Sequence, residues 1–181
     1  MNLTSQILPL AGVVIGAATS FLVTALTERT RWKRQLSVRW DERRLGAYAD
    51  YAHIVKELAQ RYQRIAVARG LTTDGSPLEP TGEVLEDLAA TEIRRSALSE
   101  TVVLLGDTRT ITASRKMNQC LWHLEGLARG NPTATHQIWG PAYDAYRDAR
   151  QNFIKQARLD LGVIGSATDQ ATWFPDWHSA N

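Results

Sequence analysis

The stretch MNLTSQILPLAGVVIGAATSFLVTALT, residues 1–27, carries no charged side chain, whereas ten of the next seventeen residues are charged. Its core, ILPLAGVVIGAATSFLVTAL (Ile7–Leu26), is twenty residues long. At about 1.5 Å per helical residue this core reaches roughly 30 Å, which is the thickness of the hydrocarbon layer of a bilayer. The sequence therefore predicts a transmembrane helix within residues 1–27.

A cleaved signal peptide and a buried helix of a soluble domain are the two alternatives for this stretch. A signal peptide starts with positive charge and has a shorter apolar run, but no Lys or Arg precedes this run. A soluble helix seldom continues for twenty residues without a charge on any face. We therefore expect an uncleaved span.

The charges that follow the span predict its orientation. Residues 28–44 hold seven basic and three acidic side chains, a net charge of +4, whereas the whole chain is +2. Positive flanks stay in the cytoplasm. The single cysteine, Cys120, cannot form an intrachain disulfide, which suits a reducing compartment. We predict a single-pass protein of the cell membrane, with a short N-terminus outside and the rest of the chain in the cytoplasm.

The basic segment also predicts contact with the anionic head groups of membrane lipids. Each cation near such a surface contributes about 1 kcal/mol, and Trp favours the interface. Nucleic acid is the alternative partner for basic residues interleaved with Trp. We expect none, because the segment adjoins the span and residues 45–181 sum to −2. The residues predicted at the membrane interface are Arg29, Arg31, Trp32, Lys33, Arg34, Arg39 and Trp40.

Small residues in the span predict helix association. Gly12, Gly16 and Ser20 recur every four residues, and such a face lets two transmembrane helices approach closely. The pattern is also common by chance in spans rich in Gly and Ala. A homodimer and a different protein partner both stay open.

Helical periodicity dominates the rest of the chain. From Glu28 to about Arg69 there is no Pro and a single Gly, Gly46, and apolar residues recur at helical spacing without a break after the span. This stripe consists of Trp32, Leu36, Trp40, Ala47, Tyr51, Val55, Leu58, Tyr62 and Ile65. A single helix is expected to run from the span into the domain and to end at Gly70.

Three further helices are expected. The second starts near Thr81 and ends before Gly106, and the third runs from about Thr108 to Ala128. The fourth has Pro141 in its first turn and ends at Gly162. The apolar faces expected for these helices are Leu85, Leu88, Leu98, Val102 and Leu105; Ile111, Met117, Leu121 and Leu124; and Ala142, Tyr146, Ala149, Phe153, Ala157 and Leu161.

The sequence thus predicts an all-α fold in which an N-terminal transmembrane helix continues into an antiparallel four-helix bundle. The expected parts are the span at 1–27, a basic juxtamembrane helical segment at 28–46, a cytoplasmic bundle at 47–162 and a tail at 163–181. The tail carries an aromatic cluster, Trp173–Trp177. It either packs back on the bundle or docks on a partner or at the lipid interface.

Motifs for catalysis are missing from the sequence. It has no Gly-rich phosphate loop, no G-x-S-x-G elbow and no H-E-x-x-H. Cys120 and His123 are three apart on a helix and make half a metal site at most. We therefore predict no enzyme, no catalytic residue, no metal and no cofactor.

Three segments resemble a group of small actinobacterial membrane proteins: WDERRLGAYADYAHIVKELA (Trp40–Ala59), VVLLGD (Val102–Asp107) and NFIKQARLDLG (Asn152–Gly162). The group has an N-terminal span, a "WxxRRxxAYADF"-like helix start, an "RLLG"-like break and a closing "FxxAARxELG"-like helix. This chain departs from it with Val103 before Leu104 and with Lys155-Gln156 before Ala157. The resemblance implies the same architecture and no mechanism.

The expected function is that of a membrane-tethered helical interaction module, which is a scaffold, an adaptor or a regulatory subunit. Its expected partners are lipid head groups and another protein or a second copy. The alternative is a sensor of small molecules or lipids, with a pocket in the bundle near Tyr48, Tyr51, Trp122 and Trp139.

Overall fold

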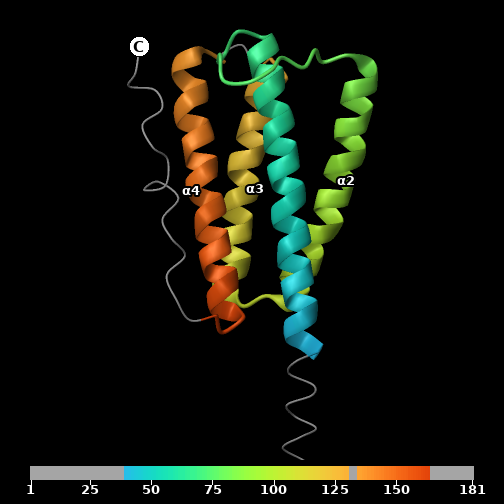
Figure 1. The fold of residues 1–181 in the computed structure, drawn as a ribbon, viewed down its shortest axis with the longest axis vertical. Coiled ribbons are helices and arrows are strands. Elements are labelled where there is room, and N and C mark those ends of the chain that lie inside the picture. The colour runs from blue at the N-terminus through green and yellow to red at the C-terminus, as the bar shows by residue number, and fades with distance from the viewer. Residues whose placement is uncertain (1–38, 131–133, 164–181) are drawn as a thin grey trace, which may run out of the picture. The chain divides into compact units, whose positions relative to one another are not determined.

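The computed structural model describes residues 39–130 and 134–163, which form four helices and no strand (Figure 1). The first helix covers residues 39–68. It is followed by α2 (Gly82–Leu105), α3 (Thr108–Ala128) and α4 (His136–Asp160). The all-helical class is therefore confirmed for the described part of the chain.

The predicted membrane segment lies outside the described residues. This holds for the span at residues 7–26, for its small residues Gly12, Gly16 and Ser20, for the interface residues before Arg39 and for the aromatic tail. Among the helices that are described, none has the length and apolar character needed to cross a bilayer.

The chain divides into two compact units, residues 1–42 and 43–181. Arg39 and Trp40 fall in the first unit, and both are exposed. We placed Trp40 on the inward stripe, but its side chain is 46% exposed. That prediction is wrong because the buried positions of the first helix begin only at Ala47.

Neighbouring helices of the bundle are antiparallel. Tyr48, near the start of the first helix, donates a hydrogen bond to Asp160 at the end of α4. Near the other end of the first helix, Gln63 Oε1 accepts from Trp139 Nε1 in the first turn of α4 at 2.9 Å. Between α2 and α3, Arg95 Nη1 donates to Asn118 Oδ1 at 2.7 Å. The up-down-up-down order expected for a four-helix bundle is therefore present within residues 43–163.

The core lies between the first helix, α3 and α4. Phe153 of α4 packs edge-on against Tyr51, with ring centroids 5.3 Å apart, and against Tyr48 at 6.1 Å. The predicted stripe is confirmed at six described positions, which are all buried: Ala47, Tyr51, Val55, Leu58, Tyr62 and Ile65. Burial of so much apolar and aromatic surface supplies the main stabilisation of the bundle.

Side-chain caps fix the helix ends that the sequence predicts. Thr81 Oγ1 accepts from Val84 N at 3.4 Å at the start of α2, and Asp107 Oδ1 accepts from Thr110 N at 2.7 Å at the start of α3. Gly106 allows the tight turn between them, because a Cβ there would lie 2.8 Å from Val102 O. Caps of this kind satisfy backbone N–H groups that have no partner inside the helix.

The start of α4 differs from the prediction. The helix begins at His136, so Pro141 lies inside it and not in its first turn. Proline removes one backbone hydrogen bond and disfavours a helical interior. Here Trp139, which is buried and bonded to Gln63, anchors the turn before the proline, so tertiary contacts extend the helix at its N-terminal end.

Candidate functional site

α2 is the helix whose buried face is least apolar. Its four buried residues are Leu88, Thr91, Arg95 and Val102, so a charged residue and a hydroxyl stand between two aliphatic ones. We expected Leu85 to face inward, but it is exposed. That prediction is wrong because residue 85 lies about a quarter turn away from the line through Leu88 and Val102.

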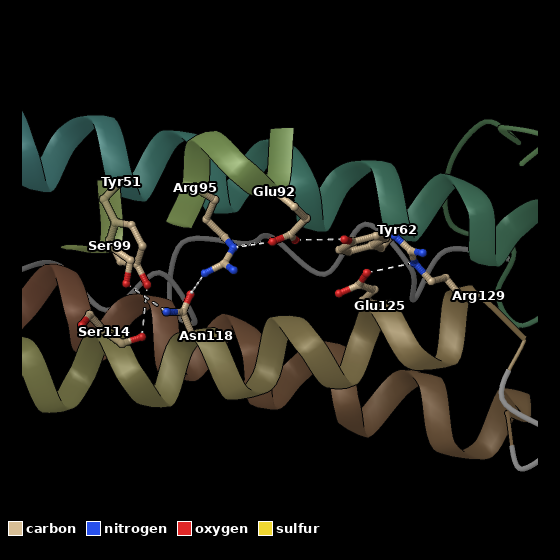
Figure 2. A network of polar contacts seen from close by, with 9 residues as sticks. All are labelled: Tyr51, Tyr62, Glu92, Arg95, Ser99, Ser114, Asn118, Glu125 and Arg129. Atoms are coloured by element: carbon tan, nitrogen blue, oxygen red, sulfur yellow. Dashed lines mark hydrogen bonds and ion pairs between the residues drawn. The ribbon is translucent and has the colours of Figure 1, made fainter. Parts of the chain in front are cut away.

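Arg95 is the centre of a polar network between α2 and α3 (Figure 2). Its side chain is buried, and its Nε donates to Glu92 Oε2 at 2.6 Å while Nη1 donates to Asn118 Oδ1 at 2.7 Å. Asn118 Nδ2 in turn donates to Ser99 Oγ at 3.2 Å. A buried charge is tolerated only when it is paired and hydrogen-bonded in this way. We call Glu92, Arg95, Ser99 and Asn118 the polar seam.

Two tyrosines of the first helix donate hydrogen bonds to its neighbours, one to the polar seam and one to α3. Tyr62 donates to Glu92 Oε1 at 3.0 Å, and Tyr51 donates to the carbonyl of Ser114 in α3 at 3.2 Å. Burial is the main cause that raises the pKa of both hydroxyls, that of Tyr51 to about 12. Both groups therefore stay protonated and act as hydrogen-bond donors near neutral pH.

Farther along α3, Glu125 Oε1 pairs with Arg129 Nε at 2.9 Å. Burial raises the pKa of Glu125, and the charge of Arg129 opposes that shift. Figure 2 shows this pair beside Tyr62, so polar groups follow one line along the bundle.

The polar seam also holds an aromatic side chain at the surface. The guanidinium carbon of Arg95 lies 5.5 Å from the ring centroid of Trp122, within the range of a cation–π contact. Trp122 is nevertheless 53% exposed. An ordered, half-exposed Trp is typical of binding surfaces, since such a ring offers a large contact area with little freedom to lose.

Two large aliphatic side chains are exposed among the charged residues on the outer side of α2. Ile93 is 72% exposed and Leu104 is 82% exposed. On a helical wheel both residues lie opposite Thr91 and Val102, which face the bundle. α2 therefore turns two large aliphatic side chains outward and a charged network inward, the reverse of an ordinary surface helix.

The neighbouring helix α3 has exposed residues of its own. Arg115 and Trp122, seven residues apart on α3, are both exposed, as are Ile93 and Glu100 on α2. We call the surface formed by Ile93, Glu100, Leu104, Arg115 and Trp122 the α2–α3 face. Its composition, aliphatic and aromatic groups with one acid and one base, suits recognition of a protein surface.

The four residues proposed to line a pocket are not brought together. Tyr48 contacts the end of α4 and Trp139 lies at its start, so about 30 Å of helix separates those two levels. Tyr48, Tyr51 and Trp139 are core residues, whereas Trp122 faces solvent.

The two residues that could form half of a metal site lie in different environments. Cys120 is buried and His123 is exposed. Within residues 39–130 and 134–163 no group of three or more His, Cys, Asp or Glu side chains is arranged to hold a metal ion.

Comparison of the chain with known protein families, curated proteins and solved structures finds no match.

Proposed function

We propose that the protein is a membrane-tethered helical interaction module, acting as a scaffold, an adaptor or a regulatory subunit. The observation that carries the proposal is the exposure of Ile93 and Leu104 on a helix whose inner side holds the buried Arg95. Exposing two large aliphatic side chains in one line has no benefit for the folding of the bundle. It is useful when a partner covers them.

The proposal is also favoured by the residues beneath the α2–α3 face, which are held in fixed positions. Arg95 is fixed by Glu92 and Asn118, and it contacts Trp122 in turn. Side chains that are ordered before binding lose less entropy on association. The surface is therefore suited to binding a folded protein.

The tether in this proposal is the predicted span at residues 7–26, with the basic residues 28–44 at the anionic head groups and the bundle on the cytoplasmic side. These parts rest on the apolar length and on the charge pattern of the sequence.

Isolation of the full-length protein from gently solubilised membranes tests the module. We expect wild type to carry a stoichiometric partner, either another protein identified by mass spectrometry or a second copy of the chain that carries a different tag, which the Ile93→Asp and Leu104→Asp variants lose. A matched control is Asn152→Asp, which adds the same charge on the exposed side of α4. Retention of the same protein by both α2 variants, or its loss in the control as well, would argue against a module that works through α2.

A further inference from the structure

The exposed charges of α2 and α3 are of opposite sign. The exposed charged residues of α2 are mostly acidic: Glu83, Glu86, Asp87 and Glu100 stand against Arg94. The exposed charged residues of α3 are basic: Arg109, Arg115 and Lys116. Because the two helices are neighbours, one copy of the bundle displays both halves of a complementary pair on adjacent helices.

The residues of the α2–α3 face have the same spacing on α2 as on α3. Ile93 and Glu100 lie seven residues apart on the exposed side of α2, and Trp122 and Arg115 lie seven residues apart on the exposed side of α3. Seven residues are two turns, so each pair lies on one side of its helix. Since α2 and α3 are antiparallel, Ile93 precedes Glu100 in the same direction along the bundle in which Trp122 precedes Arg115.

The polar seam fixes the level of one helix against the other. Asn118 is hydrogen-bonded to both Arg95 and Ser99, so it lies level with the turn between them, which puts position 93 level with about position 122 and position 100 with about position 115. Trp122 and Arg115 therefore lie at about the same levels as Ile93 and Glu100. A two-fold axis parallel to the helices would place α2 of one copy against α3 of another without changing any level.

We infer that the α2–α3 face binds the same face of a second copy of this chain. Ile93 packs on Trp122 of the second copy, and Glu100 pairs with Arg115 of the second copy. The two-fold axis repeats each contact, so two apolar pairs and two ion pairs form together. This inference rests on the proposed interaction module and names its partner.

A second copy fits this face better than an unrelated partner does, because both matched pairs come from one register. A partner that met α2 alone would leave Trp122 and Arg115 uncovered. The complementary charges also favour packing of α2 on α3 of the second copy. Packing of α2 on α2 of the second copy would bring acidic residues together.

Charge reversal with rescue tests the pairing in the intact protein. We expect the purified full-length chain in detergent to be a dimer by light scattering. Glu100→Arg and Arg115→Glu should each weaken the dimer about tenfold or more, because two symmetry-related ion pairs become repulsive. The double variant Glu100→Arg with Arg115→Glu should restore the dimer. Lys155→Glu, a reversal on the exposed side of α4, is the matched control and should leave the dimer unchanged.

Cysteine crosslinking gives a second readout that does not depend on affinity. In a Cys120→Ala background, a mixture of the single variants Glu100→Cys and Arg115→Cys, each with its own tag, should give a covalent dimer that carries both tags with a short bismaleimide, whereas a mixture of Glu100→Cys and Lys155→Cys should not. A dimer that resists every reversal and gives no crosslink would overturn the inference and indicate that another part of the chain holds it.

Failure of the second-copy pairing would not by itself contradict the proposed interaction module. If Ile93→Asp removed a different protein from the isolated complex while the charge reversals changed nothing, the second copy would be the wrong partner and α2 the right surface. Loss of neither a protein nor a dimer would overturn both.

Discussion

At the scale of single residues, the burial of Arg95 is the feature on which the structure of α2 depends. A guanidinium that leaves water needs partners for its charge and its N–H groups, and Glu92 and Asn118 supply them at 2.6 and 2.7 Å. A Glu and an Arg three residues apart on a helix have the same sequence pattern whether they face solvent or the core. Charged residues are mostly exposed, so the sequence alone did not predict the polar seam.

Removal of Arg95 should therefore be strongly destabilising. We expect Arg95→Met to lower the free energy of unfolding by about 3 kcal/mol, because Glu92 keeps a partly buried charge without its partner. Arg94→Met, one residue away on the exposed side, should change it by less than about 0.5 kcal/mol. Denaturant titration of the full-length protein, followed by circular dichroism, measures both. Equal stability of the two variants would mean that the polar seam does not hold α2.

Asp107 offers a residue whose contribution depends on pH. Hydrogen bonding from the backbone N–H of Thr110 holds the pKa of this carboxyl below its ordinary value. A carboxyl with a lowered folded-state pKa stabilises the protein above its unfolded-state pKa and loses that contribution as the pH falls through the folded-state value.

We expect Asp107→Ala to cost about 1 kcal/mol at neutral pH through loss of the helix cap. The difference from wild type should shrink as the pH falls below about 4. Thermal unfolding between neutral and acidic pH measures it, with Asp148→Ala, on the exposed side of α4, as the control. A constant difference at all pH values would contradict the capping role of the carboxylate.

At the scale of elements, the termini and inner faces of the helices were predictable to different degrees. The caps at Thr81 and Asp107 and the turn at Gly106 are local, so both ends of α2 and the start of α3 follow from the sequence. The start of α4 does not, because the anchoring of Trp139 by Gln63 is a tertiary contact. The weak apolar pattern of α2 led to the wrong orientation of Leu85.

The two sides of α2 should respond to substitution in opposite ways. Leu88 is completely buried, so Leu88→Ala should lower the free energy of unfolding by about 2–4 kcal/mol. Ile93→Ala removes a similar side chain from the exposed side and should change it by less than about 0.5 kcal/mol. Chemical denaturation of the monomeric protein at low concentration compares the pair. A large loss for Ile93→Ala would show that Ile93 is part of the core.

At the scale of the whole molecule, the bundle followed from apolar periodicity, whereas the proposed interaction surface did not. Periodicity predicts which residues face inward, and six described positions of the first helix agree with it. An interaction surface exposes apolar residues, contrary to the rule that apolar residues face inward. The sequence pattern therefore did not distinguish Ile93 and Leu104 from core residues. Their orientation depends on Arg95 occupying the inner side of α2.

The proposed membrane tether predicts how the intact chain behaves in cells. We expect it to stay in the membrane pellet after extraction with alkaline carbonate, and deletion of residues 7–26 to release it. A reporter fused to the bundle of the wild-type chain should be active on the cytoplasmic side, in agreement with the positive charge of residues 28–44. Release of the wild-type chain by carbonate would contradict an uncleaved span.

The central claim is that the outer side of α2 is the surface through which the protein acts. Site-specific photo-crosslinking in native membranes tests it most directly, with a photoreactive residue at position 93, 104 or 152 of the full-length chain. The predicted result is a discrete protein adduct from positions 93 and 104 and none from 152. Adducts of equal yield from all three positions, or no adduct from either position on α2, would contradict the claim.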